Sequence, residues 1–155
     1  MAFLPREFVV PATLVTERWK MRSININDVV KDFDAVMSSR DHLRARFGDI
    51  WGWPSDDWTL EQNLVHLGWH QHEFVLRSSF DYAVMSLDDS RLLGCVYVDP
   101  PYGGAPGIEA EVWFWGRQSE LASGLEGHME TVLRSWLASH WPFKRVLFQG
   151  QALEV

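Results

Sequence analysis

Ile108-Glu-Ala-Glu-Val-Trp-Phe-Trp115 is the stretch that decides the fold, because its residues alternate with a period of two. Such alternation predicts a strand, with the glutamates and tryptophans on one side and Ala110, Val112 and Phe114 on the other. After Gly116 the apolar spacing changes to three and four, which predicts an amphipathic helix. Its apolar face comprises Leu125, Met129, Val132, Leu133, Trp136 and Leu137. A strand that leads into a helix through a short loop points the helix's free N–H groups at the sheet, which favours anion binding.

Composition limits the classes of protein to consider. The chain has 155 residues, of which 46% are hydrophobic and 23% charged, so one globular domain is expected. A net charge of −7 argues against a nucleic-acid partner and favours either a cationic substrate or simple solubility. The single Cys95 cannot form an internal disulfide, which indicates a reducing compartment. No apolar run reaches the length of a membrane helix, and the first residues lack a signal-peptide pattern, so we expect a cytoplasmic protein with no membrane partner.

The remaining patterns predict an arm at residues 1–13 and a single domain at 14–155. Within that domain the predicted elements are a strand at 15–24, a helix from Asn27-Asp28 to about Ser39, a short helical turn and loop at 41–57, a helix from 59 to about 77, strands at 80–87 and 91–98, a loop at 99–107, and a last strand at 144–148. Thr59 and Gln62 form a capping box at one helix start. Gly94 inside its strand indicates a bulge or a close backbone approach.

The opening of the domain resembles a known family. Leu14-Val-Thr-Glu-Arg-Trp-Lys-Met-Arg22, a short break and then Asn27-Asp28 with a helix is similar to the start of GNAT-superfamily N-acetyltransferases, in the subgroup that acetylates protein N-termini and small amines. The resemblance implies an α/β (α+β) fold, with a mixed, mostly antiparallel sheet flanked by helices. The order of elements matches that fold through its fifth strand and lacks the family's last helix and two strands.

The predicted last strand, Lys144 to Phe148, would then be an unpaired edge of the sheet. Proteins rarely leave such an edge open, because its unpaired backbone groups invite association with other chains. We therefore expect a homodimer that covers or extends this edge.

The resemblance is strongest around the opening stretch, and it implies an acetyl-CoA site. Glu111 to Arg117 resembles the family's fourth strand, whose exposed backbone groups bind the pantetheine arm, here at Phe114, Trp115 and Arg117. The family's pyrophosphate loop corresponds to residues 121–126. The cofactor residues implied there and in the first helical turn are Ser123, Gly124, Leu125 and Gly127.

Only Gly124 agrees with the consensus of that loop. Leu121 replaces a polar or basic side chain, and Glu126 brings a carboxylate to the place of a pyrophosphate. Like charges about 4 Å apart repel by roughly 1 kcal/mol in water, and more where water is scarce. Ser123 and Glu126 also form a capping-box pattern that would satisfy the helix N-terminus internally. Acyl-CoA binding is therefore either weakened or lost, and Arg117 is the candidate to supply the missing positive charge.

Acetyl transfer also needs a group that takes a proton from the acceptor amine. Several members of the family place a glutamate on the fourth strand, and the resemblance assigns this catalytic role to Glu111, whereas one of Glu109 and Glu111 would otherwise simply face solvent. The predicted function is acyl-CoA-dependent N-acetyl transfer to a small-molecule or peptide amine. The alternative is a catalytically inactive GNAT-like domain that acts as a binding or dimerisation module.

Two further groups have both a functional and a plain interpretation. His66, His70 and Glu73 share one face of a predicted helix as metal ligands do, but such pairs are common on ordinary helices and the family uses no metal, so no metal site is predicted. Four of the nine tryptophans, at positions 51, 53, 113 and 115, form either an aromatic pocket for a cationic amine or part of the core.

Overall fold

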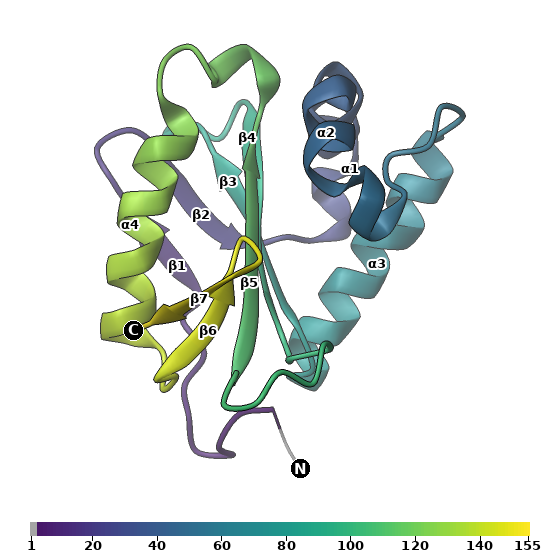
Figure 1. Ribbon diagram of the computed structural model, residues 1–155. Helices are drawn as coiled ribbons and strands as arrows, with labels where there is room; N and C mark the ends of the chain where they lie inside the picture. Colours follow the sequence, from purple (N-terminus) through teal and green to yellow (C-terminus); the bar gives the residue numbers. More distant parts are fainter. Residues whose placement is uncertain (1–2) are drawn as a thin grey trace.

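A seven-stranded sheet lies between two helical layers in the computed structural model, which describes residues 3–155 (Figure 1). The strands follow the chain in order across the sheet, and only the β5–β6 pair is parallel. Helix α4 covers one face, and α1, α2 and α3 cover the other (Figure 1). The strands are β1 (Thr13–Val15), β2 (Lys20–Ser23), β3 (Phe80–Met85), β4 (Leu92–Asp99), β5 (Ala110–Gly116), β6 (Arg145–Phe148) and β7 (Gln151–Glu154). The helices are α1 (Val29–Ser38), α2 (Arg40–Trp51), α3 (Leu60–Leu76) and α4 (Leu125–His140), with short 3-10 turns at Ile26–Asp28 and Gln118–Glu120.

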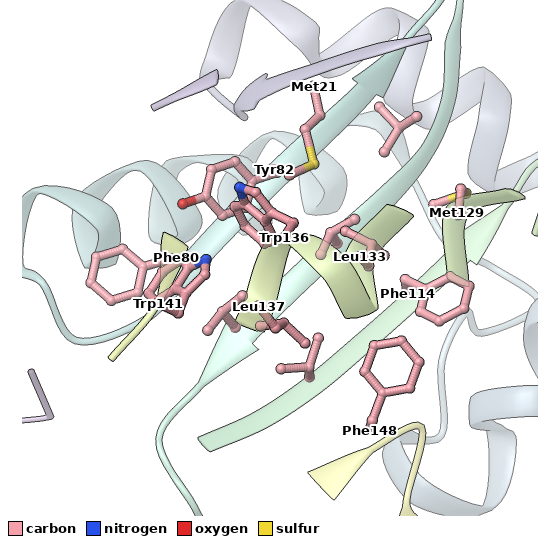
Figure 2. Packing of buried hydrophobic residues seen from close by; sticks show 14 of the residues in the cluster. Met21, Phe80, Tyr82, Phe114, Met129, Leu133, Trp136, Leu137, Trp141 and Phe148 are labelled. Atoms are coloured by element: carbon pink, nitrogen blue, oxygen red, sulfur yellow. The ribbon is translucent and has the colours of Figure 1, made fainter. Parts of the chain in front are cut away.

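Strand β5 divides the hydrophobic core as its alternation predicts. Ala110, Val112 and Phe114 pack in a cluster with α4, and Figure 2 shows Phe114 in that cluster with Leu133 and Trp136. On the opposite face, Trp115 is fully buried and Trp113 partly buried in a second cluster under α1, α2 and α3. The prediction of a mixed, mostly antiparallel sheet flanked by helices is confirmed.

The predicted start of α3 is confirmed. The Thr59 side chain accepts a hydrogen bond from the Gln62 backbone, and Gln62 returns one to the Thr59 N–H, so α3 begins at a capping box. Helix α4 ends at His140, just before Trp141-Pro142. Among the helices of residues 3–155, none is long and apolar enough to cross a membrane.

Gly94 marks a close approach between β4 and β5. A Cβ atom at this position would lie 2.1 Å from the carbonyl oxygen of Trp115, a distance that real Cβ atoms do not adopt. The register between β3 and β4 also shifts between Val84 and Met85, beside this glycine. The predicted irregularity at Gly94 is therefore present.

The predicted single strand at 15–24 is wrong over its first part, because Val15 ends β1 and β2 begins only at Lys20. Thr16 breaks the run: its hydroxyl oxygen accepts hydrogen bonds from the N–H groups of Arg18 and Trp19. The chain turns at this point, and β1 pairs antiparallel with β2, Thr13 opposite Arg22. A local side-chain bond of this kind competes with an extended ladder.

The predicted short helical turn and loop at 41–57 is also wrong over its first part, where α2 runs for 12 residues. Leu43 and Phe47 are four residues apart and fully buried, and Trp51 stacks on Phe47 at 4.4 Å between ring centroids. Gly52 then ends the helix in the left-handed conformation, with φ of 61°. Leu43 and Phe47 give this helix its buried side, and Trp51 packs over it from a partly exposed position.

The predicted free edge at Lys144–Phe148 is wrong. Gln149 and Gly150 form a tight turn with φ of 51° and 82°, and β7 returns antiparallel along β6. Strand β6 therefore has a partner on each side, β5 and β7, so the sheet does not end at Phe148. The homodimer prediction rested on that free edge, and β7 removes this reason for it.

The N-terminal arm packs against the domain. Leu4 is buried, and Phe3, Phe8 and Val10 pack against the α4-side cluster. The Arg77 guanidinium donates to the carbonyls of Pro5 and Phe8, at 3.0 and 2.9 Å. The described part of the arm is therefore held by both apolar contacts and hydrogen bonds.

Candidate functional site

The candidate site is a cleft where β5 and β6 separate. Their ladder runs from Ala110 opposite Val146 to Val112 opposite Phe148, and one more bond joins the Gln149 N–H to the Val112 carbonyl at 2.9 Å. Beyond it, β5 continues to Gly116 while the other strand turns into β7. A cavity of about 510 Å³ lies there, lined by Arg46, Ile50, Trp113, Phe114, Glu126, Gly127, Glu130, Arg134, Phe148, Gln149, Gly150 and Gln151.

The backbone of Phe114 faces this cleft but already has partners. Its N–H donates to Gln149 Oε1 at 3.0 Å, and its carbonyl accepts from Gln149 Nε2 at 2.9 Å. The Arg46 guanidinium donates to the same carbonyl at 3.0 Å. The side-chain amide of Gln149 thus pairs with both backbone groups of Phe114 in the way that a neighbouring strand, or the amide of an extended ligand, would.

Glu126, in the first turn of α4, lies at the other end of the cleft and bonds to residues from two other elements. Its Oε1 accepts from the Gly116 N–H at 3.0 Å and contacts His42 Nε2, and its Oε2 accepts from Arg46 at 2.8 Å. The predicted capping box with Ser123 is wrong: Gly124, with φ of 78°, occupies the N-cap position and no side chain caps the helix. The carboxylate instead ties α4 to β5 and α2.

The cations of the cleft are paired as well. Arg46 bonds Glu126, and Arg134 bonds Glu130 one turn along α4 at 2.9 Å. Two arginines and two glutamates therefore face the cavity, and its formal charges cancel. A diphosphate in this cavity would meet no unpaired arginine from these residues.

The prediction that Arg117 supplies positive charge to this cleft is wrong. Its guanidinium is buried away from α4 and donates to the Leu92 carbonyl at 3.0 Å and to Asp34 at 2.8 Å. A bond to Ser38 completes the set at 3.3 Å. The side chain fastens α1 to the end of β4.

The other predicted cofactor residues have separate surroundings. Gly127 lines the cavity and has open space above it, whereas Leu125 is buried. The Ser123 hydroxyl donates to the Glu120 carbonyl at 2.8 Å. Trp115 points to the opposite face of the sheet, where its Nε1 donates to the Tyr97 hydroxyl at 2.8 Å. Phe114 and Gly127 are thus the predicted residues that the fold brings together at the cavity.

Glu111, the predicted base, lies half-buried near the start of β5. Its Oε1 accepts from the N–H groups of Tyr102 and Gly103, at 3.0 and 3.1 Å. Directly opposite on β4 is Asp99, which accepts a bond from the Ser79 hydroxyl. Burial, helped by the charge of Asp81, raises the pKa of Asp99 to about 7. Two carboxyl groups therefore face one side of the sheet at this point.

A second cavity of about 290 Å³ opens beside Asp99, on the face covered by α3. It is lined by Trp51, Trp53, His66, His70, Glu73, Ser79, Asp81, Tyr97, Asp99 and Tyr102. His70 forms an ion pair with the buried Asp81. Burial disfavours the charged His70, but Asp81 and Glu73 outweigh it and raise the pKa of His70 to about 10. His70, Glu73 and Asp81 bring three ligand-type atoms within 4.8 Å of one another, a grouping for which no metal was predicted.

Several of these residues escaped the sequence interpretation. Arg46 and His42 lie on α2, which was predicted as a short turn and loop, and Gln149 follows the last predicted strand. Asp99 was assigned to a loop, although its position opposite Glu111 follows once the two strands are paired. The dipeptide Gln149-Gly150 was the available signal for the last hairpin, since glycine favours such turns.

Comparison with known proteins agrees with this geometry. No protein-family model and no curated protein matches the sequence. Among solved structures, the ribosomal-protein-S5-alanine acetyltransferase from Vibrio fischeri is similar with a TM-score of 0.67 and 15% identity, over 89% of this chain and 73% of that one. A putative GnaT-family acetyltransferase from Bordetella pertussis has a TM-score of 0.62 at 15% identity, over 89% and 78%. Mycobacterium smegmatis RimJ in complex with CoA-disulfide has 0.65 at 11%, over 88% and 66%. The chain has the fold of the GNAT N-acetyltransferases.

Proposed function

We propose that the protein is an acyl-CoA-dependent N-acetyltransferase that acts on an amine. The observation that carries this proposal is the cavity between β5, the β6–β7 turn and the first turn of α4. The resemblance described above assigns the acyl donor to this place in the fold. One solved structure with the same fold, RimJ from Mycobacterium smegmatis, is a complex with CoA-disulfide.

The reaction needs few groups. The neutral acceptor amine attacks the thioester carbonyl, a C–N bond forms, the C–S bond breaks, and CoA leaves as a thiol after taking up a proton. A base must take the proton of the ammonium form. Glu111 remains the predicted base, and Asp99, opposite it on β4, is a second candidate because a carboxyl with a pKa of about 7 is suited to neutral pH. Glu111→Gln and Asp99→Asn separate the two roles: the loss of kcat should follow the true base.

Weakened donor binding is part of this proposal. An acyl donor that uses the backbone of Phe114 must displace the Gln149 amide, and its diphosphate must approach the Glu126 carboxylate. Repulsion between like charges about 4 Å apart, at the effective dielectric of a protein surface, is a few kcal/mol. Two side chains of this chain therefore oppose the ligand that the fold favours.

Calorimetric titration with acetyl-CoA tests the proposal directly. Glu126→Gln removes the carboxylate's charge and frees Arg46 from its ion pair, so affinity for acetyl-CoA should rise at least about tenfold. Glu61→Gln is the matched control, because Glu61 is the first-turn glutamate of α3 and is exposed. If neither the wild type nor the Glu126→Gln, Gln149→Ala double variant binds acetyl-CoA, the donor site is assigned wrongly.

The second candidate function is an inactive GNAT-like binding module. The favouring observation is that Gln149 and Glu126 already satisfy the N–H groups of Phe114 and Gly116. Under this alternative the wild type binds no acetyl-CoA, whereas the double variant does. Acetyl transfer by the wild type to any amine, followed by release of free thiol, would exclude it.

A further inference from the structure

The second cavity has a composition that differs from that of the cleft. Carboxylates of Glu73, Asp81 and Asp99 line it together with the rings of Trp51, Trp53 and Tyr97. Its volume of about 290 Å³ is near the lower end of small-molecule sites, roughly 300 to 1,000 Å³. The space therefore suits a small molecule or the end group of a larger one.

The charge of this cavity is negative. The one cation among its lining residues at neutral pH is His70, and it is already paired with Asp81. The neighbouring His66 stays neutral at that pH, because burial and the charge of His70 lower its pKa. Tyr97 and Tyr102 stay neutral too, since burial raises the pKa of each. His70 also lies 3.9 Å from a Glu73 carboxylate oxygen, and Asp99, with a pKa of about 7, is partly ionised at neutral pH. Three acidic side chains therefore face one cation in this lining.

The aromatic rings supply the second half of a cation site. A tryptophan or tyrosine face attracts an ammonium group by about 0.5–2 kcal/mol, most where water is excluded. The Trp53 Nε1–H is shielded from solvent and has no hydrogen-bond partner among the described residues, so it is free to donate to an acceptor atom on the ligand's skeleton, not to its ammonium group. The rings also offer apolar area to the carbon skeleton of a ligand.

From these contacts we infer that the cavity binds a cationic amine, with its ammonium group beside Glu73 and Asp99 and its carbon skeleton against Trp51. The cavity's ability to bind the cation does not depend on acyl transfer. Identifying the amine as the acceptor of the reaction does rest on the proposed function.

The position of the cavity supports that identification. Trp113 lines the donor cleft, and its ring meets the ring of Trp51 at 5.9 Å between centroids. Trp51 lines the amine cavity, so one pair of aromatic rings lies between the two spaces. A donor and an acceptor bound in the two spaces would therefore be separated by this pair of rings.

The test uses 2-phenylethylamine as the probe, with 2-phenylethanol as its uncharged counterpart, titrated into the full chain without acetyl-CoA. We expect the amine to bind with a Kd of about 1 mM, typical of so small a ligand, and the alcohol at least about fivefold more weakly. Asp99→Asn and Trp51→Leu should each weaken the amine at least about fivefold. Asp41→Asn and Trp69→Leu, at exposed positions outside the cavity's lining, should leave it unchanged.

The outcomes separate this inference from the proposed function. Equal affinity for amine and alcohol, no binding of the amine up to about tenfold above the expected Kd, or equal effects of Trp51→Leu and Trp69→Leu would overturn the amine site. Stoichiometric Zn²⁺ binding that Glu73→Gln abolishes, without amine binding, would overturn it in favour of a metal site. Amine binding by a protein that no acetyl-CoA titration saturates supports the cavity while rejecting the transferase.

Discussion

The cleft beside α4 and the cavity beneath α3 are neighbours on either side of the Trp51–Trp113 ring pair, and their polar groups are satisfied to different degrees. In the cleft the backbone groups of Phe114, the carboxylate of Glu126 and both arginines are bonded within the chain. In the cavity the carboxylates outnumber the cations, and a buried indole N–H has no partner. The fold therefore points to one binding region and the local chemistry points to another.

That difference has a simple physical basis. Buried polar groups must be satisfied by protein, water or ligand, and unsatisfied ones destabilise the folded state. A region whose groups are satisfied internally gains stability and loses affinity, whereas a region with unneutralised charge keeps affinity and gives up stability. Three experiments break or sharpen the comparison, in decreasing order of expected effect.

Gly94→Ala should damage both regions at once. The new Cβ would meet the backbone carbonyl of Trp115, which has no room to move, so β4 and β5 must separate. We expect the free energy of unfolding in urea to fall by at least about 3 kcal/mol. Gly68→Ala is the control: its Cβ meets nothing within 4 Å, and alanine in a helix interior should stabilise by about 0.5–1 kcal/mol. Equal stability of the two variants would contradict the close approach.

Asp99→Asn should change how stability depends on pH through the cavity alone. The folded-state pKa of Asp99, about 7, lies above its unfolded value near 3.8, so its contribution is fully present below pH 4 and is lost as pH rises toward 7. Between pH 4 and pH 7.5, the free energy of unfolding of the variant should therefore fall by about 1–2 kcal/mol less than that of the wild type. Thermal unfolding between pH 4 and 8 measures this, with Asp41→Asn as control. Burial raises the pKa of Asp32 to about 6, so in both Asp99→Asn and Asp41→Asn this residue adds a smaller decrease of stability with rising pH.

Gln149→Ala should affect the cleft alone, and least. Two hydrogen bonds are lost, but water can enter the cavity and replace them. The free energy of unfolding should therefore fall by only about 1 kcal/mol. The sharper readout is amide hydrogen exchange at Phe114, which should accelerate while that of Val112 stays unchanged. Gln151→Ala, on the next strand, is the control. Unchanged exchange at Phe114 would show that the Gln149 amide does not protect it.

Much of the fold could be predicted from local patterns. The alternation of 108–115 and the spacing of the next helix predicted β5 and α4, and Thr59 with Gln62 marked the start of α3. The elements that were missed depend on long-range contacts. Helix α2 has few apolar residues, and its two buried positions have meaning only once the sheet lies beneath them. Strand β7 has one partly buried residue among four, so its sequence carries almost no pattern.

The candidate site was less predictable than the fold, for a related reason. The sequence indicated that Glu126 was out of place in a phosphate loop, but not which groups it bonds. Two of those partners, His42 and Arg46, come from α2, 84 and 80 positions earlier in the sequence. The same holds for Arg117, whose nearest carboxylate, Asp34, lies 83 positions earlier. Charge and spacing along a chain cannot specify such pairs.

The turn that carries Gln149 determines how easily a single amino-acid substitution could open the cleft during evolution. Its φ of 51° is left-handed, a conformation that disfavours most L-residues by roughly 1–2 kcal/mol and that asparagine tolerates better. Replacing Gln149 by asparagine would create Asn-Gly, the preferred sequence of a two-residue hairpin turn. It would also shorten the amide that pairs with Phe114. Opening a binding site usually lowers the stability of a protein. At this position the more favourable turn would offset the lost hydrogen bonds, so one substitution can open the cleft at little loss of stability.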